Sequence, residues 1–147
     1  MPLIWRAMKA DNEKPQIGRG KKLLGVLVGP AANDDINPDE DGYVHPATGG
    51  MSVSPKVEAL PTHRLPTRLR KKYPERFPDA SGPNGLHCWW MGEGPFVPER
   101  IAERLLLRPD QDNPERHGLV EPDAKMLTED YETALAATRE QWRRWEE

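Results

Sequence analysis

Cysteine is almost absent from this 147-residue sequence, in which Cys88 stands alone. One cysteine excludes a disulfide within the chain and a cysteine-based zinc site, and it fits a reducing compartment. Long apolar runs are missing as well, since none approaches the ~20 residues that span a bilayer. The first residues are charged too early for a secretion signal. We therefore expect a cytoplasmic protein that does not insert into a membrane.

An excess of charge of one sign is also lacking. The sequence has 21 lysines and arginines against 24 aspartates and glutamates, a net charge of −3, so nothing attracts it globally to nucleic acid or an anionic membrane. Apolar residues make up only 36%, whereas 16 prolines and 12 glycines are present. Five tryptophans nevertheless indicate a packed core. One loop-rich domain over residues 1–147 is expected.

Short strands separated by turns are expected along most of the chain. The expected strands are Leu3–Met8, Met51–Ser54, Leu86–Met91 and His117–Glu121, and residues 98–107 fit either a helix or a strand. The clearest helix is at the end, where Thr128 is the expected N-cap and an apolar stripe runs from Leu127 to Trp145. This pattern predicts an α+β fold with a small mixed, mostly antiparallel sheet and few helices.

Residues 63–76 form the one basic stretch, with six lysines and arginines against Glu75. Leu65, Leu69 and Tyr73 recur at helical spacing, which predicts a short amphipathic helix. Its charges form either a solvated face or a patch for nucleic acid, an anionic substrate or an acidic partner. The four histidines are too widely spaced for a metal motif, so no metal site is expected.

The segment Tyr43–Pro55 is the most informative stretch. Gly49 and Gly50 allow unusual backbone geometry and the close approach of a ligand, and Ser52 follows on a short strand. The pair fits either a plain hairpin turn or a binding turn. Together with Arg6 and two residues of a late strand, His117 and Glu121, this serine forms a set that suits a dinucleotide, because arginine matches phosphate with two parallel bonds.

A family resemblance rests on motifs that occur in matching order along almost the whole chain. These motifs are Leu3–Ala7, Tyr43 with Pro46, Thr48-Gly49-Gly50, Ser52-Val53, Phe96-Val97, His117, Pro122, Ala124-Lys125 and Arg139–Trp145. In these features the chain resembles the ADP-ribosyltransferase-like toxins of the type VI secretion system, typified by its second Pseudomonas effector. Two departures stand out: Met51 replaces a threonine of the family, and Glu121 is only a candidate for the late-strand glutamate.

The resemblance implies an NAD-dependent ADP-ribosyltransferase, or an NAD glycohydrolase with the same site. Such a toxin acts in the cytoplasm of a target cell, enters without a signal peptide, and is neutralised by a cognate immunity protein. The residues implied as catalytic are Ser52, His117 and Glu121, and those implied for binding NAD are Arg6, Tyr43, Thr48, Gly49, Gly50 and Ser52. The macromolecule modified is not implied.

Two other hypotheses remain open from the sequence. One is a non-catalytic binding module of the same fold, which uses residues 63–76 to bind RNA or an acidic partner. The other is an antitoxin or structural partner, suggested only by the aromatic terminal helix.

Overall fold

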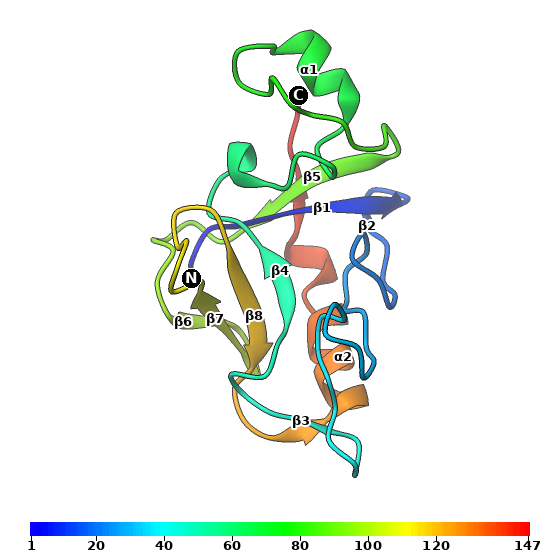
Figure 1. Ribbon diagram of the computed structural model, residues 1–147, viewed down its shortest axis with the longest axis vertical. Coiled ribbons are helices and arrows are strands. Elements are labelled where there is room, and N and C mark those ends of the chain that lie inside the picture. Colours follow the sequence, from blue (N-terminus) through cyan, green and yellow to red (C-terminus); the bar gives the residue numbers. More distant parts are fainter.

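Two four-stranded sheets and a two-stranded ribbon build the computed structural model, which describes residues 1–147 (Figure 1). In spatial order, the first sheet is β10 (Arg143–Arg144), β5 (Leu86–Met91), β1 (Ile4–Asp11) and β2 (Lys14–Pro15). The second is β4 (Met51–Val53), β8 (Gly118–Pro122), β7 (Leu105–Pro109) and β6 (Glu99–Ala102), and the ribbon pairs β3 (Tyr43–Val44) with β9 (Met126–Leu127). The helices are α1 (Thr67–Lys72) and α2 (Thr128–Ala136), with short 3₁₀ turns at Val57–Ala59 and Arg139–Gln141.

All the strand pairs within these sheets are antiparallel. The α+β class with mostly antiparallel strands and few helices is therefore confirmed. The four expected strands correspond to β1, β4, β5 and β8, and the ambiguous residues 98–107 form most of a hairpin, β6 and β7. None of the helices is both long and apolar enough to cross a membrane.

The two larger sheets meet where β1 passes the end of β4. The backbone N–H of Trp5 donates to the oxygen of Ser54 at 2.8 Å, and the N–H of Ser54 donates back to Trp5 at 2.9 Å. In Figure 1, β1 and β5 run across the view while β4 and β8 run down it. The sheets therefore diverge from this junction instead of forming one continuous surface.

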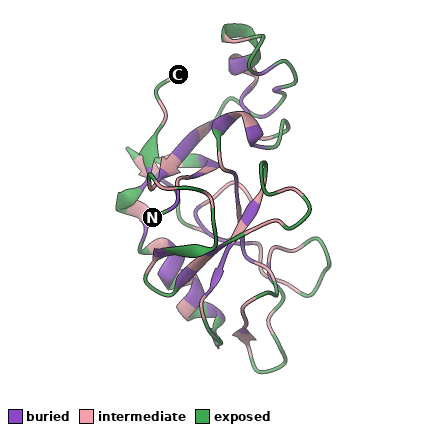
Figure 2. Cartoon of the chain, turned by 90° about the vertical axis from the view of Figure 1, so that its left-hand side faces the viewer, coloured by how far each residue is buried: buried purple, intermediate pink, exposed green.

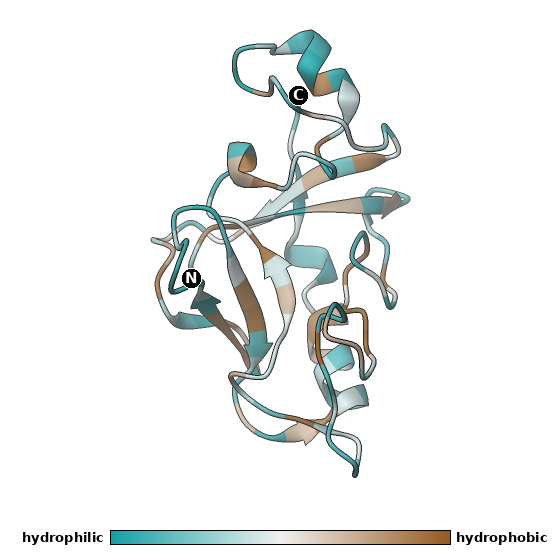
Figure 3. Ribbon diagram, in the orientation of Figure 1, coloured by the Kyte–Doolittle hydropathy of each residue, from teal (hydrophilic) through white to brown (hydrophobic).

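The core lies in two clusters, which appear as the purple stretches of Figure 2. The larger cluster includes Ile4, Met8, Trp89 and Tyr131 and joins both sheets to α2. It also takes in apolar residues of the loop 23–28, which Figure 3 colours brown although it forms no strand. The smaller cluster lies under α1, where Phe77 is buried. Burial of these side chains holds short elements together despite the low apolar content.

The terminal segment differs from the single long helix that the apolar stripe predicts. Helix α2 ends at Ala136, and β10 then adds Arg143 and Arg144 to the edge of β5. Pairing this edge satisfies backbone groups that an exposed strand would leave open. The prediction that Thr128 is the N-cap was wrong, because Leu127 is the N-cap and Thr128 is the first helical residue. The hydroxyl of Thr128 donates instead to the backbone oxygen of Gly42 at 2.8 Å.

The predicted amphipathic helix in the basic stretch is confirmed as α1, although it has only six residues. Leu69 is fully buried, as its place on the apolar face predicts. The helix begins after Pro66 and ends before Tyr73, which agrees with the limits that proline sets on helices.

Candidate functional site

A pocket of about 350 Å³ opens at the junction of the two sheets. Its lining includes Arg6 of β1, Ser52 of β4 and His117, which directly precedes β8. These three residues lie far apart in sequence and come from three segments of backbone. The structure thus brings together three of the four residues that suggested a dinucleotide site.

Arg6 is almost completely buried, with 4% of its surface exposed. Its Nη1 donates to the oxygen of Ser52 at 2.7 Å, and its Nε and Nη2 donate to that of Leu23 at 3.1 and 3.0 Å. Nη2 also lies 3.3 Å from the oxygens of Gly20 and Gly25. The guanidinium therefore fastens the loop 20–25 to β4, and only Nη1 keeps an N–H for a ligand.

Burial lowers the pKa of Arg6 to about 10, and the nearby carboxylate of Asp35 opposes this shift. The side chain remains charged at neutral pH. Its charge is compensated by carbonyl dipoles rather than by a paired acid, because Asp35 itself bonds to Lys21 Nζ at 2.7 Å and to the N–H of Leu27 at 2.7 Å.

Ser52 faces the pocket because of the alternation of β4. Met51 and Val53 are buried on the core side, whereas Ser52 is half-buried on the other face and pairs with Leu119 of β8. A rigid paired strand fixes the position of this hydroxyl better than a loop does.

His117 pairs with a carboxylate at the rim of the pocket. Its Nδ1 lies 3.3 Å from Oδ2 of Asp110. The backbone N–H of Asp112 and the hydrogen bond to His117 hold the pKa of Asp110 below its usual value. A carboxylate at Nδ1 orients the ring and leaves Nε2 for proton transfer, which is the arrangement of a histidine base.

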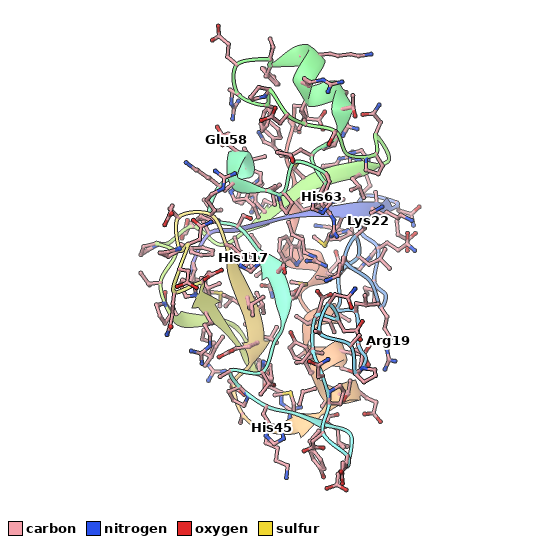
Figure 4. The ribbon with its side chains drawn as sticks, viewed as in Figure 1. Arg19, Lys22, His45, Glu58, His63 and His117 are labelled. Atoms are coloured by element: carbon pink, nitrogen blue, oxygen red, sulfur yellow. The ribbon has the colours of Figure 1, made fainter.

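A second pocket of about 370 Å³ adjoins the first, and both are lined by His63 and His117. Asn113 and Arg116 belong to the second alone. Figure 4 labels the two shared histidines near the centre of the molecule, well away from His45. The site is therefore two-lobed, with His63 and His117 in the wall that the lobes share.

Glu121 does not line either lobe. It is 2% exposed, and its Oε2 accepts hydrogen bonds from Arg108 Nε at 2.8 Å and from the N–H of Ala47 at 3.0 Å. The carboxylate lines a separate pocket beside β7, and its contacts give it a structural role.

The remaining residues of the turn also lie outside the pocket at the sheet junction. The ammonium group of Lys125 lies over the Tyr43 ring, 4.5 Å from the ring centre. The hydroxyl of Thr48 donates to the backbone oxygen of His45 at 2.6 Å. Side chains at Gly49 and Gly50 would collide with backbone oxygens of Asp35 and Val120. This turn packs against the backbone of Asp35 and Val120 just before β4, and its residues do not line the pocket.

Four further ionisable residues line the pocket at the sheet junction and were not predicted as site residues: Lys21, Asp35, His63 and Arg64. Lys21 and Asp35 carry no local signal, because they lie in irregular loops that the fold brings together. Arg64 and His63 are part of the basic stretch, and only their charge marked them.

Most of the basic stretch is used inside the molecule. Arg68 forms two hydrogen bonds of 2.6 Å with the carboxylate of Glu147. Arg76 bonds to Glu58 at 3.0 Å and lies over the Trp145 ring, 5.4 Å from its centre. Arg68 thus ties α1 to the residues that follow β10, and Arg76 is held just beyond α1, so fewer cations remain for RNA or an acidic partner.

Neither a metal centre nor a reactive thiol competes with this site. The structure contains no group of three or more histidine, cysteine, aspartate or glutamate side chains that could hold a metal ion. Cys88 is buried in β5, and burial raises the pKa of its thiol to about 12. A thiol that stays protonated is a poor nucleophile.

Comparison with known proteins does not place the chain in a family. No protein-family model matches it, and no curated protein is significantly similar to it.

Proposed function

We propose that this protein binds NAD in the two-lobed site and breaks the bond between nicotinamide and ribose, as an ADP-ribosyltransferase-like toxin. The observation that carries the proposal is the meeting of Arg6, Ser52 and His117 in one pocket. The sequence motifs that resemble the toxin family contain these same three residues. The pocket volume is within the range of small-molecule sites.

The residues divide the chemistry between binding and proton transfer. The Ser52 hydroxyl bonds to the nicotinamide ribose, and the pocket cations hold the pyrophosphate. When the glycosidic bond breaks, nicotinamide leaves with the bonding electron pair and positive charge develops on the ribose. An oxygen of the acceptor attacks the ribose carbon and gives its proton to His117, whose ring is oriented by Asp110.

The second lobe supports transfer to an acceptor. Because His117 lines both lobes, a group placed beside Asn113 and Arg116 lies against the same histidine as a ligand in the pocket of Arg6. A macromolecular acceptor gives ADP-ribosyl transfer, and water in its place gives NAD hydrolysis. A cognate immunity protein that covers this opening is part of the proposal.

The test is nicotinamide release from NAD by the purified protein. We expect His117→Ala to lower kcat by about 100-fold or more, the usual contribution of a general base. Ser52→Ala should lower kcat by about tenfold, through the loss of one hydrogen bond. The matched control is His45→Ala, since His45 also pairs with a carboxylate, Asp39, at similar exposure but away from the pocket.

A folded wild-type protein that neither binds NAD by calorimetry nor releases nicotinamide contradicts the proposal. Inducible expression in a bacterium extends the test, with growth and NAD content as readouts. Growth arrest by wild type and not by His117→Ala supports a toxin. The binding-module hypothesis remains the alternative, and salt-sensitive RNA binding that is lost on charge reversal at Arg70 and Lys71 would favour it.

A further inference from the structure

Arg64 carries the one poorly compensated positive charge in the wall of the pocket at the sheet junction. The other two cations there are accounted for, because Arg6 bonds to backbone carbonyls and Lys21 pairs with Asp35 at 2.7 Å. Arg64 makes a single bond, from Nη1 to the backbone oxygen of Lys21 at 2.7 Å. Its Nε is buried and has no hydrogen-bond partner.

The unused part of Arg64 is the edge formed by Nε and Nη2. In two other arginines of this protein, Nε and Nη2 donate to the two oxygens of one carboxylate. Arg19 bonds to Glu132 in this way at 2.7 and 2.9 Å, and Arg68 bonds to Glu147 at 2.6 Å through both nitrogens. The two N–H groups of this edge match the spacing of two oxygens on a carboxylate or a phosphate. In Arg64 no acid of the protein fills that place.

The burial of Arg64 favours an anion from outside. Burial disfavours the charge of the guanidinium and lowers its pKa, and the nearby carboxylate of Asp35 offsets this effect only in part. A buried donor without a partner is unfavourable, so a ligand oxygen that reaches it gains a strong bond. The exposed His63 lines the same pocket and offers a further donor; Figure 4 labels it above His117.

We propose that Arg64 binds a phosphate group, through a small rotation of its guanidinium that presents Nε and Nη2 to two phosphate oxygens. The inference rests on the proposed function, in which this phosphate is part of the NAD pyrophosphate. It shifts the main phosphate contact from Arg6 to Arg64. Arg6 then acts as a positioning residue that shapes the pocket by holding β4 and the loop 20–25.

The test measures binding of three probes by calorimetry: ADP-ribose, inorganic pyrophosphate and nicotinamide. We expect Arg64→Gln to bind the two phosphate-containing probes at least about tenfold more weakly, as the loss of a charge-assisted bond predicts. Nicotinamide, which has no phosphate, is unaffected. Arg64→Lys restores only part of the affinity, because an ammonium group lacks the paired donors.

The matched control is Arg70→Gln, which removes an equal charge from an exposed position on the neighbouring helix. Thermal unfolding without ligand checks that both variants fold. Added pyrophosphate should raise the unfolding temperature of wild type and of Arg70→Gln but not of Arg64→Gln, because a ligand stabilises only the state that binds it.

The outcomes separate this inference from the proposed function. Equal binding of ADP-ribose by wild type and Arg64→Gln overturns the inference, even when wild type releases nicotinamide from NAD. Arg64-dependent binding of pyrophosphate by a protein that leaves NAD intact supports the phosphate site and sinks the proposed activity. A folded wild type that binds neither phosphate-containing probe overturns the inference.

Discussion

At the scale of single residues, Glu121 shows how a buried carboxylate is held by its surroundings. Its Oε2 receives one bond from the half-exposed Arg108 and one from the backbone N–H of Ala47. The second bond fixes the segment that precedes the Gly49-Gly50 turn. Removing the carboxylate leaves the N–H of Ala47 without its partner, so we expect the substitution to lower the stability of the fold.

We therefore predict that Glu121→Ala lowers the free energy of unfolding by about 1–3 kcal/mol, the cost of leaving buried polar groups unpaired. Urea denaturation monitored by tryptophan fluorescence measures it. Glu99→Ala is the control, since Glu99 is an exposed acid of the same sheet, and its effect should stay within about 0.5 kcal/mol. Equal urea midpoints for both variants would refute the structural role of Glu121.

The turn residues show what local sequence predicts and what it leaves out. Gly49-Gly50 correctly predicted a special backbone before a strand, since Gly49 has a φ of +128°. Whether the glycines serve a ligand or the fold depends on what lies against them, and that is the backbone of Asp35 and Val120. Neither neighbour is adjacent in sequence, so no local pattern contains this information.

At the scale of elements, the last 20 residues show why periodicity misjudged one helix. The apolar stripe from Leu127 to Trp145 fits a single helix, but Trp142 is buried only after a turn, with its indole N–H donating to Thr138 Oγ1 at 2.9 Å. The open edge of β5 then competes for the chain and forms β10. Pairing with the edge of β5, which is distant in sequence, therefore determined the structure of residues 143–144 in place of their helical periodicity.

The contact between Glu147 and α1 leads to a prediction about pH. The hydrogen bond from Arg68 holds the pKa of Glu147 below the usual 4.5, with help from the charges of Arg68, His87 and Lys72. A lowered acid pKa gives stability that is complete above 4.5 and is lost as pH falls through the folded-state value. The attachment of the residues after β10 to α1 should therefore weaken in acid.

We predict that Glu147→Gln costs about 1 kcal/mol of stability at pH 7, in line with a partly exposed ion pair. The difference from wild type should shrink as pH falls from 6 to 3, because wild type then loses the same charge. Urea midpoints across this range give the measurement. Glu146→Gln is the neighbouring control, and a gap between Glu147→Gln and wild type that stays constant with pH would contradict the assignment.

At the scale of the whole molecule, two sheets and a long loop depend on one arginine. The alternation of β1 puts Arg6 on the face of Ile4 and Met8, but a strand pattern gives no sign of what the guanidinium contacts. Its partners are backbone oxygens, which every residue has, so their convergence could not be inferred from residue types. The lining of the pocket followed the same rule: the motifs contained Ser52 and His117, while the presence of Lys21 and Arg64 beside them required the fold.

The last prediction concerns this junction. Arg6→Met keeps an unbranched apolar stem but leaves the oxygens of Gly20, Leu23, Gly25 and Ser52 without the guanidinium. Four buried or partly buried acceptors lose their donor together, so we expect a loss of about 3 kcal/mol in unfolding free energy.

Arg6→Lys should recover only part of this loss, because a single ammonium group cannot reach all four oxygens. Lys9→Met is the control, since Lys9 is exposed on the same strand, and it should change the urea midpoint little. If Arg6→Met unfolds at the same urea concentration as Lys9→Met, Arg6 does not hold the sheets together. Its buried charge would then have to be explained by a ligand in the pocket, which would return the main phosphate contact from Arg64 to Arg6.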